Sequence, residues 1–278
     1  MSEVAGRESR GEDREFLVRV EHLSKTYSGG GLFHRTDDET PAIHDVSFDV
    51  APGETLGLVG GSGSGKTTIA RTMLRLIEPT SGRVLVNLPS GDRVDLMALQ
   101  AAELRAVRRH VQIVFQDPYA SLNPRLTVRD TVEEPLRIHQ IVAAADVSNR
   151  ATQLLELVGL SAGILDELPE KLSGGQRQRV GIARAIATEP SFVVADEPVT
   201  ALDVSVQAQI LNLLKDLQET LGLGYLFISH DLAVVEQMSD RIAVLSGGEI
   251  VEIGETAAIL EAPQHPDTQR LVRTARPS

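Results

Sequence analysis

The sequence predicts an α/β protein whose core is a mixed, mainly parallel sheet, with an N-terminal antiparallel β subdomain and an inserted helical subdomain. Short apolar runs at residues 55–60, 191–197 and 225–230 suit strands that are buried on both faces. Helical periodicity separates the last two runs, which indicates parallel strands joined by a crossover helix. Strand signals fade over about residues 117–172, where helix and loop patterns with several prolines predict the inserted helical subdomain.

The N-terminal part predicts a tail followed by a hairpin. Residues 1–14 are charged and lack a periodic apolar face, so we expect a disordered tail. Residues 15–27 and 42–50 alternate apolar and polar side chains, as half-buried strands do. A Gly- and Asp-rich insertion lies between them. The pattern therefore predicts two antiparallel strands with a long tip.

Helical spacing follows two of the apolar strands. After residues 55–60, Ile69, Met73 and Leu76 recur on one helical face, and the sequence EPTSG ends this helix. A second set of apolar residues lies between the later strands: Val206, Ile210, Leu213, Leu214 and Leu217. The order strand, glycine loop, helix is therefore expected around Lys66.

The C-terminal part predicts a hairpin and a tail. Residues 241–255 form two strand patterns that turn at Gly247 and Gly248. We expect one domain over residues 15–254, followed by a short helical or irregular tail over residues 255–278.

Composition limits the function classes. The 278 residues are 42% hydrophobic, carry a net charge of −12 and include no cysteine. Cysteine chemistry, iron–sulfur clusters and disulfides are thereby excluded. The acidic balance argues against a nucleic-acid partner, which would need a basic face. No apolar run of about 18 residues occurs, and the charged N-terminus lacks the apolar core of a secretory signal, so we expect a protein that remains in its compartment of synthesis.

One glycine-rich stretch predicts a phosphate-binding loop. Residues 60–67 fit the pattern G-x-x-x-x-G-K-[ST]. In such a loop backbone N–H groups converge on phosphate oxygens, Lys66 supplies an ammonium group, and the Thr67 hydroxyl joins the shell of Mg²⁺. A surface turn is the simpler alternative, but the flanking strand and helix argue against it. The core is thus expected to be that of a P-loop NTPase. The expected nucleotide-binding residues here are Gly60, Gly61, Ser62, Gly63, Ser64, Gly65, Lys66, Thr67 and Thr68.

Two acids end the apolar strand at residues 192–195. An Asp at this place holds Mg²⁺ in P-loop enzymes, which assigns Asp196. Glu197 is then placed to orient or deprotonate a water that attacks the γ-phosphate, while Lys66 places its ammonium at the β- and γ-phosphates. Taken alone, paired acids could equally be a solvated strand end or a helix cap. Their occurrence after an apolar strand, in the same chain as Lys66, favours the catalytic interpretation.

A second glycine-rich turn predicts another anion site. Ser173, Gly174 and Gly175 precede a helix whose residues Val180, Ile182 and Ala183 are expected to pack inward, so its N-terminus faces an anion. Three arginines add positive charge nearby: Arg177, Arg179 and Arg184. An ordinary N-cap by Ser173 is equally compatible with this pattern. Because only one lysine-bearing loop is present, this turn predicts half of a site that a partner completes.

Five stretches together carry a family resemblance. GGSGSGKTT, LSGGQRQR, VVADEP, ALD and ISHD resemble the motifs of ABC transporter ATP-binding subunits, and the resemblance extends from about residue 15 over nearly the whole chain. The stretches VFQDPYASLNPR and DEPVTALDVSVQAQILNLL are similar to the ATPases of bacterial dipeptide and oligopeptide importers.

The resemblance implies further site residues. Tyr27 matches the aromatic residue that stacks on adenine, and Gln116 matches the glutamine that contacts Mg²⁺ and the attacking water. Asp203 matches an acid that reaches across a dimer, and His230 matches the histidine that positions the water at the γ-phosphate. Without the motifs, Tyr27 would be a strand-edge residue and His230 an ordinary surface or core histidine. Gln176 completes the nucleotide-contacting set of the second turn.

The resemblance also implies an assembly. Two such subunits, alike or different, would dimerise head to tail, each Ser-Gly-Gly turn closing over the ATP of its partner. We expect them to sit at the cytoplasmic face of the plasma membrane, with integral membrane permeases and an extracytoplasmic substrate-binding protein. The implied function is ATP hydrolysis that drives solute import, with di- or oligopeptides as the solute.

Some features depart from the importer pattern, and other functions stay open. Gly61 stands where the subgroup usually has Glu, and the sequence after His265-Pro266 lacks the usual aromatic residue. An alternative is a non-transport ABC ATPase, such as an accessory subunit of a phosphonate-breakdown complex. A GTPase or small-molecule kinase on the same loop would lack a base-specificity motif and leave LSGGQ unexplained.

Overall fold

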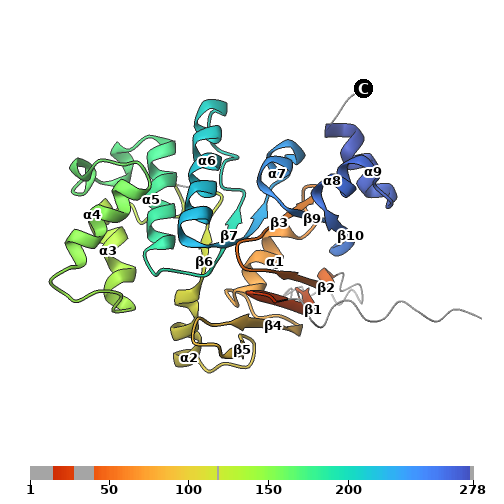
Figure 1. Cartoon of the computed structure of the whole chain (residues 1–278), viewed down its shortest axis with the longest axis horizontal. Helices are drawn as coiled ribbons and strands as arrows, with labels where there is room; N and C mark the ends of the chain where they lie inside the picture. Colours follow the sequence, from red (N-terminus) through yellow and green to blue (C-terminus); the bar gives the residue numbers. More distant parts are fainter. Residues whose placement is uncertain (1–14, 28–40, 118, 276–278) are drawn as a thin grey trace, which may run out of the picture.

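The computed structural model describes residues 15–27, 41–117 and 119–275. Within them the chain forms two sheets and a group of helices (Figure 1). The predicted tail at residues 1–14 and the tip of the first hairpin lie outside the described residues.

An antiparallel sheet has the order β2-β1-β4-β5. Its strands are β1 (Val18–Thr26), β2 (Pro41–Val50), β4 (Ser81–Asn87) and β5 (Arg93–Asp95). The predicted hairpin is confirmed, since β1 pairs with β2 from Val18 opposite Val50 to Thr26 opposite Pro41. Strands β4 and β5 were not predicted, and they extend this sheet on the other side of β1.

The second sheet has the order β10-β9-β3-β8-β7-β6, and all its neighbours are parallel except β9 and β10. Its strands are β3 (Thr55–Gly60), β6 (Val111–Val114), β7 (Phe192–Asp196), β8 (Gly224–Ile228), β9 (Arg241–Ser246) and β10 (Glu249–Glu255). The predicted hairpin turns at Gly247 and Gly248, whose φ angles of 58° and 86° suit a two-residue turn. The α/β fold class with a mainly parallel sheet is confirmed.

The apolar strands are buried on both faces, as expected. In β7, Phe192 and Val194 belong to a core between the two sheets and the helix α1 (Lys66–Met73). Val193 and Ala195 point to the opposite face and belong to a second core with the long helices. Alternation along one strand thus joins two hydrophobic cores.

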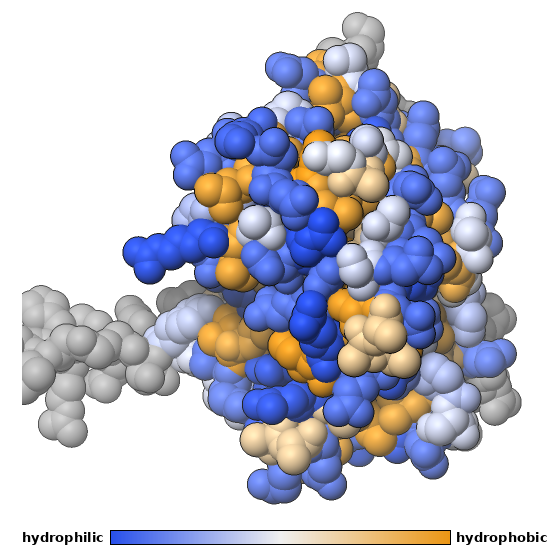
Figure 2. Space-filling model, turned by 90° about the vertical axis from the view of Figure 1, so that its left-hand side faces the viewer, coloured by the Kyte–Doolittle hydropathy of each residue, from blue (hydrophilic) through white to orange (hydrophobic). Residues whose placement is uncertain are grey.

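Helices pack against both of these cores. They are α1 (Lys66–Met73), α2 (Ala101–Val107), α3 (Val128–Ile138), α4 (Val147–Leu157), α5 (Gly174–Ile186), α6 (Val204–Leu221), α7 (Leu232–Met238), α8 (Thr256–Glu261) and α9 (Pro266–Ala275). The part of the chain that the structure describes also has three 3₁₀ turns: η1 (Arg108–His110), η2 (Ala162–Ile164) and η3 (Pro169–Lys171). Figure 1 shows α3, α4 and α5 grouped at one end, away from the antiparallel sheet. On the face of this group seen in Figure 2, hydrophobic residues form separate patches among hydrophilic ones.

The helix after the phosphate loop is shorter than predicted. It ends at Met73, and Leu76 lies outside it with 47% of its surface exposed. Arg75 takes a left-handed conformation with φ of 50°, and its guanidinium donates to the carbonyls of Leu96 and Leu99 at 3.2 and 2.7 Å. These long-range bonds turn the chain before the apolar repeat is complete.

The helical insertion lies between two neighbouring strands, because β6 and β7 pair in parallel and residues 115–191 connect them. Helix α5 packs against α3 and α4, and its residues Val180, Ile182 and Ala183 are buried as predicted. The boundaries 117–172 for the subdomain and 15–254 for the domain stay predictions. The described part of the predicted tail, residues 255–275, contains α8 and α9.

Candidate active site

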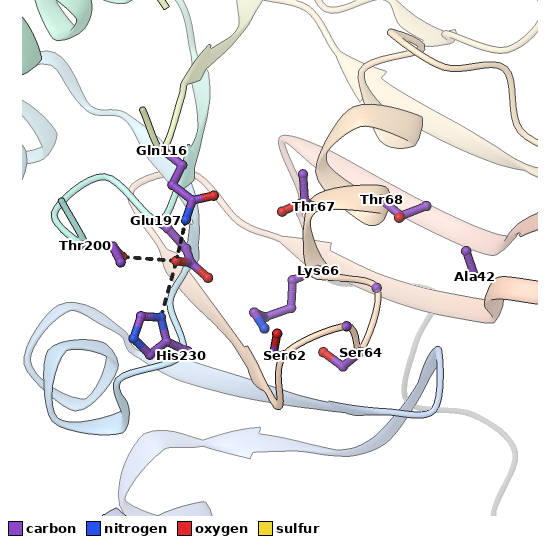
Figure 3. Close-up of a pocket in the computed structure, with 12 residues that line it drawn as sticks. Ala42, Ser62, Ser64, Lys66, Thr67, Thr68, Gln116, Glu197, Thr200 and His230 are labelled. Atoms are coloured by element: carbon purple, nitrogen blue, oxygen red, sulfur yellow. Dashed lines mark hydrogen bonds and ion pairs between the residues drawn. The ribbon is translucent and has the colours of Figure 1, made fainter. Parts of the chain in front are cut away.

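A cavity of about 580 Å³ opens above the ends of β3, β7 and β8 (Figure 3). It lies at the carboxyl ends of parallel strands, where ligands of open α/β sheets bind, and its size suits a nucleotide-sized ligand. The residues that line it are Ala42, Ser62, Gly63, Ser64, Gly65, Lys66, Thr67, Thr68, Gln116, Glu197, Thr200 and His230.

The phosphate loop has a conformation that requires glycine at two places. Gly65 has φ of 109°, and a Cβ atom there would lie 2.6 Å from the carbonyl oxygen of Ala42. A Cβ atom on Gly60 would lie 2.3 Å from the carbonyl oxygen of Leu245. At Gly61, where the importer pattern has Glu, nothing lies within 4 Å of an added Cβ. A Glu side chain at position 61 would start in open space, so its replacement by glycine removes no packing contact of its Cβ atom.

Lys66 begins α1 and points into the loop. Its Nζ donates to the carbonyls of Gly60 and Gly61 at 2.9 and 3.0 Å. Burial lowers the pKa of the Lys66 ammonium, while the carboxylates of Glu197 and Asp196 oppose that shift. Because the first turn of α1 has no acidic side chain and no side-chain cap, its N-terminal N–H groups and the Lys66 ammonium favour an anion.

Asp196 lies beside Thr67 at the end of β7. The Thr67 hydroxyl donates to Asp196 Oδ1 at 3.3 Å, and Asp196 is only 2% exposed. Burial raises the pKa of the Asp196 carboxyl above its usual range, which the Thr67 hydrogen bond partly offsets. A cation at this carboxylate would relieve the cost of its burial.

These two oxygen ligands fit Mg²⁺. The ion prefers carboxylate, hydroxyl, phosphate and water oxygens and usually takes few ligands from protein. Accordingly, the described residues contain no cluster of three or more His or acidic side chains that could hold a metal by themselves. Thr67 and Asp196 would hold the ion beside the loop, where it would supply positive charge to phosphate oxygens. Gln116, also a predicted ligand, lies in the cavity but contacts Glu197.

Glu197 is held by three donors on one carboxylate oxygen (Figure 3). Its Oε2 accepts from Gln116 Nε2 at 3.0 Å and from Thr200 Oγ1 at 3.1 Å, and it lies 3.3 Å from His230 Nδ1. Glu197 has φ of 47°, an uncommon conformation for a non-glycine residue, and its N–H donates to the carbonyl of Ile228 at 3.0 Å. The other oxygen, Oε1, makes no hydrogen bond within the described residues and is available to a water.

The structure thus brings together Lys66, Thr67, Asp196, Gln116, Glu197 and His230, all of which the sequence singled out. Thr200 was missed. Its only signal in the sequence is its position three residues after Glu197. In a turn, this spacing brings the Thr200 hydroxyl close to the Glu197 carboxylate. Ala42 was missed as well, because it comes from the antiparallel sheet.

The second glycine-rich turn does not line this cavity. Ser173 caps α5 in a capping box with Gln176. The Ser173 hydroxyl accepts from the Gln176 N–H at 3.3 Å, and the Gln176 Oε1 accepts from the Ser173 N–H at 2.9 Å. Added Cβ atoms on Gly174 and Gly175 would meet Leu202 at 3.3 Å and Val206 at 2.6 Å, so both glycines pack closely against the start of α6. The capping alternative is therefore correct as local structure. Whether the turn also binds an anion stays a prediction.

Two other predicted contacts also lie outside the cavity. Tyr27 follows β1 and is 52% exposed, with Lys25 Nζ 5.3 Å from its ring centre. Asp203 is the exposed N-cap residue of α6 and makes no side-chain capping bond. Their roles toward adenine and toward a partner subunit stay predictions.

The guanidinium groups of the three α5 arginines donate to backbone carbonyls of other segments, and their effect on an anion at the turn stays a prediction. Arg177 donates to the carbonyls of Pro169 and Glu170, Arg179 to that of Val158, and Arg184 to that of Ser121. Burial lowers the pKa of Arg184. All three guanidiniums are used to join chain segments, a role that the helical spacing did not indicate.

Among the described residues, no helix combines the length and the apolar composition that crossing a bilayer requires.

Comparisons with known proteins agree on one family. The family model described as "ABC transporter" matches residues 43–200. The glutathione import ATP-binding proteins GsiA of Escherichia coli (strain K12) and Shigella flexneri serotype 5b (strain 8401) are each 50% identical over 270 residues, 96% of this chain. The chain spans 42% of the length of these curated relatives.

Solved structures match as well. The ATP-binding cassette MJ0796, as a dimer in a post-hydrolysis state bound to ADP and Pi, is 32% identical with a TM-score of 0.74, covering 86% of this chain and 98% of its own. The cbiO1 protein of Clostridium perfringens, part of the ABC transporter complex cbiONQ, is 25% identical with a TM-score of 0.74 and covers 95% and 97%.

Proposed function

Because the chain belongs to the ABC transporter family, we propose that it binds ATP with Mg²⁺ and hydrolyses the ATP as the nucleotide-binding subunit of an importer. One observation carries this proposal: the phosphate-loop lysine, the buried acid Asp196 and the triply bonded Glu197 meet at a single cavity.

The sequence-based predictions of the family and of the P-loop fold class are confirmed by these matches. The ATPase class is confirmed at the level of the family, since a solved relative holds ADP and Pi. ATP as the ligand agrees with the family model and with the names of the relatives.

The side chains divide the chemistry in the following way. Lys66 would exchange the carbonyls of Gly60 and Gly61 for phosphate oxygens, which gain more from an ammonium than neutral carbonyls do. The free Oε1 of Glu197 would accept a proton from the attacking water, while Thr200 and His230 keep Oε2 in place. His230 would hold that carboxylate, and Gln116 would contact the water that is in line with the γ-phosphate.

The assembly follows from what the cavity lacks. The Ser173 turn offers a helix N-terminus, yet it lies apart from the loop of its own chain. In a dimer with a second ATPase subunit, identical or paralogous, the Ser173 turn of this chain would contact the ATP bound by the partner. The corresponding turn of the partner would contact the ATP bound by this chain. Support comes from a solved relative that was obtained as a dimer.

The solute and the remaining partners follow from the relatives. Half of the residues are identical to proteins named for glutathione import, and glutathione is a small peptide. We infer a di- or oligopeptide or a close analogue as the solute, permease subunits as the membrane part, and an extracytoplasmic binding protein. The subunit would act at the cytoplasmic face of the membrane. No observation favours the phosphonate-breakdown alternative.

Substitution of one lysine tests the function. Lys66→Ala should lower the rate of MgATP hydrolysis by at least about a hundredfold, the scale for removing a preorganised charge from a transition state. Lys215→Ala, on helix α6 and outside the cavity, is the matched control and should hydrolyse ATP like the parent. Equal rates for Lys66→Ala and the parent, or no MgATP binding by the parent, would reject the proposal.

A further inference from the structure

An exposed tyrosine lies against a buried arginine next to the active site. Tyr119 is 65% exposed, whereas Arg177 of α5 is 5% exposed. The Arg177 guanidinium carbon lies 3.8 Å from the centre of the Tyr119 ring. An aromatic face so close to a desolvated cation is an attractive contact.

Arg177 has few other groups to compensate its charge. Its Nε donates to the carbonyl of Pro169 at 2.6 Å and its Nη2 to that of Glu170 at 3.1 Å. Its Nη1 is buried and has no hydrogen-bond partner among the described residues. The ring of Tyr119 therefore contributes an important part of the environment that keeps this cation buried.

Arg177 joins the two sides of the Ser173 turn. The carbonyls that it holds belong to η3, which ends two residues before Ser173. Its own backbone lies in the first turn of α5, where its N–H donates to the carbonyl of Ser173 at 2.9 Å. A shift of this guanidinium would move η3 and the start of α5 relative to each other, and thereby the Ser173 turn.

Tyr119 belongs to the segment that starts at Gln116. Asp117 ties this segment into a turn, because its Oδ1 accepts from the Tyr119 N–H at 2.7 Å and its carbonyl from the Ser121 N–H at 2.9 Å. Gln116 reaches Glu197 in the cavity at 3.0 Å. One short turn thus touches the catalytic carboxylate at one end and the buried arginine of α5 at the other.

The same segment has room to move. A cavity of about 360 Å³ lies beside it and is bounded by Gln116, Asp117, Ala120, Ser121 and the buried Asp196. Arg184 provides a second attachment to α5, through the carbonyl of Ser121 at 2.7 Å. A change at Gln116 can therefore displace the turn without disrupting a packed core. The turn contacts α5 through Tyr119 on Arg177 and through Ser121 on Arg184, so its displacement would move α5 as well.

We propose that Tyr119 is a positioning residue that couples the occupancy of the nucleotide cavity to the Ser173 turn through its stack on Arg177. The inference rests on the proposed function, because the turn is useful only to a partner's nucleotide. When Gln116 leaves Glu197 for a ligand in the cavity, the segment shifts, the ring carries the guanidinium with it, and the turn takes its position for the partner subunit.

Two substitutions separate the aromatic face from bulk. Tyr119→Leu keeps an apolar side chain but removes the face, whereas Tyr119→Phe keeps the face and loses only the hydroxyl. Both should fold, since the side chain is mostly exposed. Hydrogen exchange of residues 169–176 is measured with and without MgATP at a protein concentration where the chain is monomeric. Dimerisation in MgATP is measured by sedimentation in the Glu197→Gln background.

We expect Tyr119→Leu to bind MgATP like the parent, to lose the ATP-dependent change in exchange at residues 169–176, and to dimerise at least about tenfold more weakly, the scale of one desolvated cation–π contact. Tyr119→Phe should match the parent in all three measurements. An unchanged ATP response in Tyr119→Leu would overturn the inference. So would a loss of protection that is equal with and without nucleotide, because a purely structural contact would give that result. If the Glu197→Gln parent itself does not dimerise, the proposed function fails, and the exchange measurement still decides the link.

Discussion

Replacement of Glu197 by Gln tests the catalytic geometry most directly. All three contacts to this side chain use Oε2, and the donors are Gln116, Thr200 and His230. In Glu197→Gln the amide oxygen must take the Oε2 position, because an NH₂ group there would face the donors. Each donor that lost its acceptor would forfeit about 0.5–1.5 kcal/mol, the net scale of one hydrogen bond. The amide nitrogen is thereby forced into the position of Oε1, where it cannot accept a proton from water.

The expected magnitudes follow from this geometry. Loss of a positioned general base lowers a rate by about 10²–10⁴-fold. Folding should be little affected, since the three hydrogen bonds to Oε2 remain and the repulsion between Glu197 and Asp196, which helps to raise the pKa of Asp196, is removed. We therefore expect a Tm within about 3 °C of the parent, on the scale of 2–4 °C per kcal/mol for a chain of this size.

The assay measures phosphate release at saturating MgATP and, in parallel, size-exclusion chromatography with and without MgATP. Glu197→Gln should hydrolyse ATP at least about a hundredfold more slowly and should accumulate as an ATP-bound dimer. Thr200→Val, which removes one donor and keeps the base, is the matched control and should lose only about tenfold, the scale of one hydrogen bond to a charged group. A Glu197→Gln rate close to that of the parent, or equal losses in both variants, would refute the assignment of Glu197 as the base.

Three further outcomes can be checked by thermal unfolding and MgATP binding. Gly65→Ala should destabilise the chain by at least about 1 kcal/mol and abolish MgATP binding, because φ is 109° and the new methyl group meets a carbonyl. The control Gly61→Ala, which has open space, should change the free energy of unfolding by less than about 0.5 kcal/mol. Equal effects of the two substitutions would contradict the loop geometry. Asp196→Asn should raise the Tm of the nucleotide-free chain at pH 7 and remove Mg²⁺-dependent hydrolysis. Since burial raises the pKa of Asp196, the parent itself becomes protonated as the pH falls, so this gain should shrink toward pH 4, and a gain independent of pH would count against the buried charge. Burial, and next the charge of Arg109, lower the pKa of His110 below its ordinary value of 6.5. Its neutral form therefore contributes stability that is present above pH 6.5 and is lost as the pH falls toward the folded pKa. His110→Gln should therefore lose less stability than the parent between pH 7 and 5, and parallel pH curves would argue against this origin.

Local sequence patterns predicted the parts of the site that depend on neighbouring residues. The phosphate loop needs glycines and a lysine at set intervals along one stretch of chain, and Asp196 and Glu197 follow one apolar strand directly. The turn at Gly247 and Gly248 likewise depends on the φ angles of two adjacent residues. A sequence pattern of a few neighbouring residues predicts such features, because local residue types determine the backbone conformation of a turn and the apolar pattern of a buried strand.

The motif resemblance added residues that no local pattern singles out. His230 and Gln116 lie on separate segments, and only their places in the family motifs indicated that they approach Glu197. The cavity confirms that both lie near the phosphate loop. Tyr27 and Asp203 were chosen in the same way, but they do not line this cavity. Their roles toward adenine and a partner subunit stay predictions.

What the tertiary structure decided is the direction of side chains and the ends of elements. Leu76 continues the apolar repeat of α1, yet Arg75 binds two distant carbonyls and ends the helix early. Arg177 and Arg184 were singled out for their positive charge, and the structure shows that they also bind carbonyls and the Tyr119 turn. In each case the deciding partner lies far along the chain or on another segment, and a buried cation takes whichever acceptors the packed fold places within reach. The sequence by itself determined which chemical groups are available and how the backbone presents them, whereas only the packing of distant segments determined which of those groups meet.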